Sequence, residues 1–148
     1  MKNVYVYCYK KKKINKLLVH SILSKIRKNF NLNIRSLEIN FVSRETIRKV
    51  NNEYLSHDYS TDIITFDYSN ERNILDGEII ISLRDAEENS KKYQVTFDNE
   101  LLRLIIHGIL HLLGYDDVTL PKKRVMKKIE DTITENFNKY SKGLVNIK

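Results

Sequence analysis

The chain has 148 residues, of which 41% are hydrophobic and 30% are charged, and its net charge is +7 at pH 7. This length suits one domain with a substantial core, and with four glycines and one proline no flexible linker is expected, so the sequence predicts a single domain over residues 1–148. The lone cysteine, Cys8, excludes an internal disulfide framework. No apolar stretch is long enough to cross a bilayer and no signal-type segment is recognisable, so a cytoplasmic protein is expected.

Lysine and arginine outnumber aspartate and glutamate by 26 to 19, and the basic residues gather in residues 10–13, 25–28 and 122–128. A positive balance favours polyanionic partners, of which nucleic acid is the commonest. Basic runs of this kind also occur on faces that contact only solvent, so two interpretations of these segments stay open.

Residue patterns predict a series of strands and helices that interleave along the chain. Strands are expected where β-branched and aromatic residues gather, and helices where apolar residues recur at every third or fourth position. The expected strands are residues 4–9, 37–42, 62–67 and 78–81, and a polar turn is expected over 70–76. The expected helices are residues 14–28, 44–54 after a Ser43 cap, 83–93 after a Ser82 cap, 98–114 and 120–140. This pattern predicts a sheet of about four strands covered by helices.

The strongest functional signal is the segment HGILHLLGYDD at residues 107–117. His107 and His111 are four residues apart, which on a helix places both imidazoles on one face, one turn apart. Their nitrogens can then reach one cation at about 2.0–2.1 Å. Gly114 is the expected end of the helix, because a left-handed C-cap prefers glycine, and the turned chain can bring Asp117 back as a third ligand. Two histidines and one carboxylate leave a coordination position open, which is typical of a catalytic metal site.

This spacing matches the zincin peptidase motif HExxHxxGxxH, with two differences. The last ligand is Asp117 instead of histidine, and Gly108 stands where the peptidase has its general-base glutamate. Without a carboxylate after the first histidine, peptide hydrolysis by the usual zincin mechanism is disfavoured.

The helix that carries the histidines is apolar on nearly all sides. Its polar residues and glycines lie on one stripe, made of Glu100, Arg103, His107, His111 and Gly114. One histidine in such a helix is more often a buried core residue than a ligand, but the paired spacing, the glycine and the acid together favour a metal site. A buried helix with one polar stripe is expected to line a cleft.

Five segments, in this order along the chain, resemble the YbeY endoribonucleases, also called rRNA maturation factors. The segments are NNEY at residues 51–54, Asp58, TDIITF at 61–66, DGEIIIS at 76–82 and HGILHLLGYD at 107–116. The resemblance implies an α+β domain with a small mixed four-stranded sheet, about five helices and a metal site on a central apolar helix. It also implies a cytoplasmic, zinc-dependent enzyme that acts on single-stranded RNA, matures the 3′ end of small-subunit rRNA and serves in ribosome quality control.

Two positions depart from the family's pattern. The third ligand is usually histidine but is Asp117 here, and a set of two histidines and one carboxylate also suits Fe(II), Ni or Mn. An arginine common after the NNEY segment is Leu55 here. The next candidate cation for RNA is Arg103, which either binds a phosphate or forms a salt bridge with Glu100, three residues earlier.

The sequence therefore predicts a metal-dependent endoribonuclease of rRNA processing, with metal ligands His107, His111 and Asp117 and with Arg103 binding the RNA. It identifies no general base; Glu100 is within reach only if its side chain points into the cleft. The alternatives are a non-catalytic ribosome-assembly factor with a structural metal and, disfavoured by Gly108, a small metallopeptidase.

Overall fold

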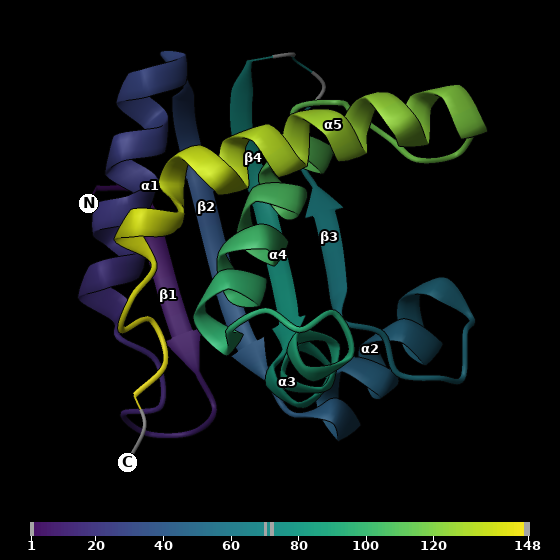
Figure 1. Cartoon of the computed structure of the whole chain (residues 1–148). Coiled ribbons are helices and arrows are strands. Elements are labelled where there is room, and N and C mark those ends of the chain that lie inside the picture. Colours follow the sequence, from purple (N-terminus) through teal and green to yellow (C-terminus); the bar gives the residue numbers. More distant parts are fainter. Residues whose placement is uncertain (1, 70, 72, 147–148) are drawn as a thin grey trace.

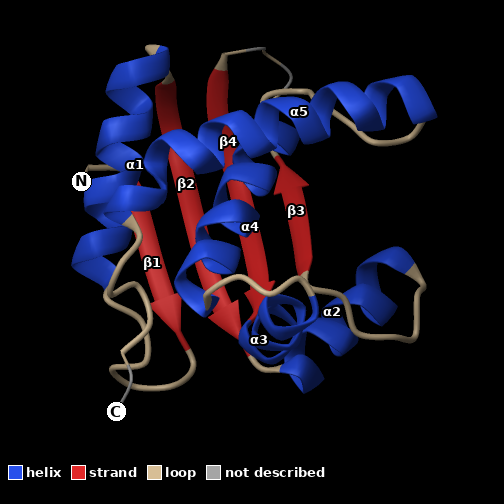
Figure 2. Ribbon diagram, viewed as in Figure 1, coloured by secondary structure: helices blue, strands red, loops and turns tan. Residues whose placement is uncertain are grey.

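Four strands form one mixed sheet in the spatial order β1-β2-β4-β3 (Figures 1 and 2). The strands are β1 (Val4–Cys8), β2 (Asn33–Val42), β3 (Ile63–Asp67) and β4 (Ile74–Ser82). β1, β2 and β4 run parallel, while the edge strand β3 pairs antiparallel with β4. These features come from a computed structural model, which describes residues 2–69, 71 and 73–146.

Each of the α-helices is preceded by a residue whose side chain accepts a hydrogen bond from a backbone N–H of the first turn. The helices are α1 (Lys16–Phe30), α2 (Arg44–Leu55), α3 (Leu83–Lys92), α4 (Phe97–Leu112) and α5 (Leu120–Phe137), and a short 3-10 helix follows at Asn138–Tyr140. Their caps are Asn15, Ser43, Ser82, Thr96 and Thr119. A capping side chain pairs a backbone N–H that the helix itself leaves free, and this fixes where each helix starts.

The α+β class, the mixed four-stranded sheet and the helices predicted from the sequence are confirmed. The predicted polar turn over residues 70–76 is wrong for residues 74–76, which belong to β4, while Asn70 and Arg72 lie outside the described residues. β2 likewise begins four residues earlier than expected, at Asn33 rather than Leu37. The two early segments pair with each other, Asn33 with Ile74 and Ile34 with Leu75, so a partner distant in sequence decides their conformation.

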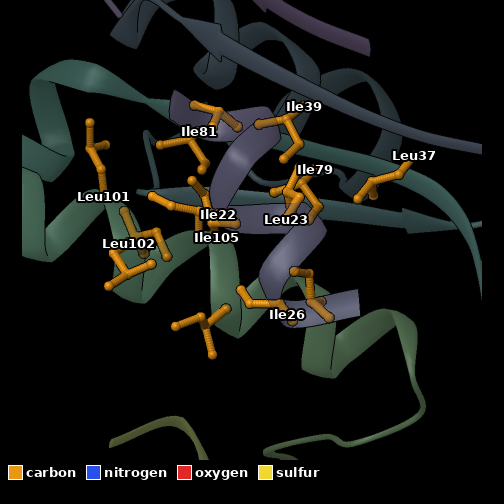
Figure 3. Packing of buried hydrophobic residues seen from close by; sticks show 14 of the residues in the cluster. Ile22, Leu23, Ile26, Leu37, Ile39, Ile79, Ile81, Leu101, Leu102 and Ile105 are labelled. Atoms are coloured by element: carbon orange, nitrogen blue, oxygen red, sulfur yellow. The ribbon is translucent and has the colours of Figure 1, made fainter. Parts of the chain in front are cut away.

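The core lies between the sheet and the layer formed by α1 and α4. Inward side chains of the sheet, including Leu37, Ile39, Ile79 and Ile81, meet Ile22, Leu23 and Ile26 of α1 and Leu101, Leu102 and Ile105 of α4 (Figure 3). On the opposite face α2 is packed through Ile47, which contacts Ile64 and Ile80. Successive side chains of a strand point to opposite faces, so Ile79 and Ile81 pack against α1 and α4 while Ile80 packs against α2.

Helix α4 is enclosed because the sheet lies behind it and α5 crosses in front of it (Figure 1). Ten of its 16 residues are buried, among them Glu100. A helix with this degree of burial holds its few polar side chains at fixed positions, and that rigidity suits a binding site. In the described part of the chain, no helix has the length and apolarity required to traverse a bilayer.

Candidate metal centre

The two histidines of α4 lie one above the other near its C-terminal end. The ring centroids of His107 and His111 are 4.7 Å apart. The helix then ends in a Schellman turn: Gly114 has φ of 101°, its N–H donates to His111 O at 3.0 Å, and the Tyr115 N–H donates to Leu110 O at 3.0 Å. The predicted role of Gly114 is confirmed, because this left-handed conformation costs glycine little.

The turn returns the chain to the histidines, as the spacing predicts. One side-chain ligand atom from each of His107, His111 and Asp117 lies within 4.8 Å of the other two, so the group could hold one metal ion. Asp116 is held elsewhere, since its carboxylate accepts from the Val118 N–H at 3.1 Å and lies 3.5 Å from Lys122 Nζ. The donor set of two imidazoles and one carboxylate suits a divalent transition metal.

The electrostatics favour neutral imidazole at the second histidine. Burial lowers the pKa of His111, and the neighbouring His107 lowers it further, although Asp117 acts in the opposite direction. A metal ligand must be unprotonated, so the lowered pKa of His111 reduces the free-energy cost of deprotonating it when an ion binds.

A buried carboxylate that the sequence analysis missed orients the first histidine. Glu130 of α5, whose side chain is 4% exposed, is hydrogen-bonded to His107 Nδ1 and accepts from Arg103 Nη1 at 2.9 Å. Burial raises the pKa of Glu130, but the bonds from His107 and Arg103 outweigh burial and hold the pKa below its ordinary value. With Nδ1 engaged, Nε2 of His107 remains for a metal ion, an arrangement that is common around ligating histidines.

Glu130 does have a weak signal in the sequence. It lies four residues after Met126 and four before Thr134, and with Phe137 these residues form the buried side of α5. A glutamate on the inner stripe of a helix requires a partner, because a buried charge is almost always paired.

Arg103, which the sequence assigns to the RNA, forms the salt bridge with Glu100 that was the alternative interpretation, and also a second, unexpected one with Glu130. Its Nε and Nη2 donate to the Glu100 carboxylate at 2.9 and 2.6 Å, and its Nη1 donates to Glu130. Glu100 is 1% exposed and faces Arg103 and Asn89, so it is no free base in the cleft. Three of the five guanidinium N–H groups are thereby used, and the side chain is 25% exposed.

The three candidate ligands open onto a cleft of about 380 Å³ between α4 and the β3 edge of the sheet. Its other lining residues come from α2, β3 and the loop between them: Asn51, Leu55, His57, Tyr59, Thr61, Asp62, Ile63, Ile64 and Thr65. Burial raises the pKa of Asp62, whose carboxylate accepts from Asn89 Nδ2 at 3.0 Å. A larger, mostly apolar hollow of about 690 Å³ lies against α1 and α5 and contains none of the three ligands.

Gly108 has no room for a side chain. A Cβ atom there would lie 2.7–2.9 Å from three side-chain atoms of Ile79, so position 108 faces the sheet. A glutamate at this position, as in zincin peptidases, would have to displace the core. The peptidase alternative is therefore not favoured.

The fold and the site define a small α+β domain built around a buried helix with a group able to hold one metal ion. The chain belongs to the endoribonuclease YbeY family, whose model matches residues 5–138. The resemblance noted in the sequence is thus confirmed.

Individual relatives agree with this assignment. An endoribonuclease YbeY from Chlorobium limicola is 44% identical over 110 residues, which cover 74% of this chain and 74% of that protein. The one from Azobacteroides pseudotrichonymphae is 39% identical over 124 residues, or 84% and 88% of the two chains. A solution structure from Thermotoga maritima superimposes with a TM-score of 0.69 at 26% identity, covering 93% of this chain and 91% of the other.

Proposed function

We propose that the protein is a metal-dependent endoribonuclease that cleaves single-stranded RNA in the processing of small-subunit rRNA. The observation that carries the proposal is the convergence of His107, His111 and Asp117 beside an open cleft, in a chain of the endoribonuclease YbeY family. We likewise infer that the protein acts in the cytoplasm, on the ribosomal small subunit and its precursors.

The ion assigned to the site is Zn²⁺, although the donor set also accepts Fe(II), Ni or Mn. Bound there, the metal would supply a Lewis acid for attack on a phosphodiester. His107, His111 and Asp117 would hold the ion, and Glu130 would keep the proton of His107 on Nδ1 and so leave Nε2 free to bind the metal.

We assign the RNA backbone to positive side chains that lie outside the residues lining the cleft. Arg103 keeps two N–H groups that are not used by Glu100 or Glu130, and we assign them to a phosphate of the substrate. Exposed basic residues on the first turns of α5, including Lys122, Lys123 and Arg124, and those in residues 10–13 and 25–28 supply further phosphate contacts.

Two measurements on the purified protein test the proposal. Metal content is determined by mass spectrometry, and cleavage of an end-labelled single-stranded RNA is followed for wild type, His111→Ala and His20→Ala. His20 lies on α1, outside the residues that line the cleft, and is the matched control. We expect His111→Ala to lose both metal and cleavage while His20→Ala keeps both. A protein that binds metal but cleaves no single-stranded RNA would contradict an enzymatic role.

A further inference from the structure

The loop between α2 and β3 places two stacked aromatic rings on the wall of the metal cleft. His57 and Tyr59 line the same cleft as the candidate ligands. Their ring centroids are 5.2 Å apart with 13° between the planes, and the Tyr59 hydroxyl lies 3.0 Å from His57 Nδ1. Tyr59 is nevertheless 56% exposed, so the pair offers an aromatic surface to the solvent rather than to the core.

Buried Asn51 fixes the backbone that carries both rings. Its carbonyl accepts from the His57 N–H at 3.1 Å, and its side-chain amide donates to the Tyr59 carbonyl at 2.9 Å. The Ser60 hydroxyl donates to the carboxylate of Asp85, in the first turn of α3, over a distance of 3.3 Å. The loop is therefore attached to α2 and α3 before any ligand arrives, which lowers the entropy that binding costs.

We propose that the stacked rings of His57 and Tyr59 form a platform for one unpaired nucleobase of the RNA whose phosphate lies at the metal centre. This inference rests on the proposed function. A flat, exposed aromatic pair suits a base, because every base has a π-face and single-stranded RNA can splay its bases out of the strand. The base would belong to a nucleotide beside the phosphate that is cleaved, since rings and ligands share one cleft.

The test compares steady-state cleavage of a short single-stranded RNA by metal-loaded wild type, Tyr59→Ala, Tyr59→Phe and Tyr93→Ala. Tyr93 has the same exposure, 56%, but lies at the end of α3 outside the cleft, so it is a matched control. We expect Tyr59→Ala to raise KM about tenfold, the size of one lost base–aromatic stack, with little change in kcat. Tyr59→Phe and Tyr93→Ala should keep the KM of wild type.

An abasic nucleotide next to the cleavage position identifies the contact. It should raise the KM of wild type by a similar factor and leave the KM of Tyr59→Ala unchanged, because the variant has no stack to lose. Equal effects of the abasic nucleotide on both proteins, or an unchanged KM in Tyr59→Ala, would overturn the platform while the endoribonuclease activity stands. If wild type cleaves no RNA, the proposed function falls, and the platform falls with it.

Discussion

Glu130 on α5 is hydrogen-bonded to Nδ1 of His107 on α4, 23 residues earlier in the chain. The pKa of Glu130 lies below its ordinary value, so Glu130 is an ionised acceptor and His107 is the donor. The bond fixes the tautomer of the first candidate ligand and joins the two helices at the metal centre. Helix α5 therefore acts on the site through one buried carboxylate, although it carries none of the three ligands.

Replacing this carboxylate should weaken both metal binding and the fold. Glu130→Ala removes the acceptor of His107 and one partner of Arg103, and loss of such an outer partner typically costs about 10–100-fold in metal affinity. We expect the free energy of unfolding to fall by about 1.5–3 kcal/mol, the range for a hydrogen bond to a charged group. Zinc affinity is measured by competition with a chelator, and stability by urea unfolding of the metal-free protein.

Glu135 provides the control for this variant, since it lies on the exposed side of the same helix. Glu135→Ala should leave zinc affinity and stability close to wild type. If Glu130→Ala binds zinc as tightly as wild type does, Glu130 does not orient the ligand.

The third ligand should be Asp117 and not Asp116. Asp117 provides a ligand atom within 4.8 Å of those of both histidines, whereas Asp116 caps Val118 and pairs with Lys122. Metal content is therefore expected to drop in Asp117→Ala and to persist in Asp116→Ala. Equal loss in both variants, or loss only with Asp116→Ala, would contradict the assignment.

Arg103 should prove important to the fold as well as to RNA. Arg103→Ala leaves Glu100 and Glu130 as buried carboxylates without their shared cation, which should lower the free energy of unfolding by about 3–5 kcal/mol. Cleavage, assayed at a temperature where the variant is folded, should lose roughly 1.5–3 kcal/mol of transition-state stabilisation if Arg103 also binds a phosphate. Arg103→Lys should recover only part of each, because an ammonium makes no bidentate contact. Reduced stability with unchanged kcat/KM would leave Arg103 a purely structural residue.

The parts of the site that local chemistry determines could be predicted from the sequence. The i, i+4 histidines, the glycine that ends α4 and the acid three residues later all follow from helix geometry and capping. The serine caps of α2 and α3 follow from the same kind of rule. In each case the interacting groups lie within a few residues of one another.

The remaining features depend on partners distant in sequence. Glu130 meets His107 only because α5 crosses α4, and Asp62 reaches the cleft only because β3 joins the sheet edge beside α4. The early starts of β2 and β4 depend in the same way on their mutual pairing. Sequence periodicity describes each element separately, so it predicted α4 and α5 without the bond between them.

Gly108 should be intolerant of even a methyl group. In Gly108→Ala the new Cβ would lie 2.7–2.9 Å from Ile79, and such overpacking typically lowers the free energy of unfolding by about 1–3 kcal/mol. A second substitution, Ile79→Ala, provides the matching space. Thermal and urea unfolding of both single variants and the double variant should therefore show the loss from Gly108→Ala shrinking in the Ile79→Ala background. A loss of the same size in both backgrounds would mean that the methyl meets something else.

Asp62 should make the metal-free protein less stable as the pH rises. Burial raises the pKa of its carboxyl above the ordinary value of 3.8. Between pH 3.8 and this raised pKa, the folded state therefore keeps a proton that the unfolded state has already released. The stabilising contribution is full below pH 3.8 and disappears as the pH passes the raised pKa of the folded state. Asp62→Asn removes the charge and keeps an oxygen that can accept from Asn89.

In the presence of a chelator, the Tm of Asp62→Asn should exceed that of wild type at neutral pH, and the difference should shrink toward acid pH. Asp131→Asn, which changes an exposed aspartate on α5, should show no such pH-dependent difference in Tm from wild type. A lower Tm for Asp62→Asn at neutral pH would mean that Arg103 and His107 stabilise the Asp62 carboxylate more than burial disfavours it.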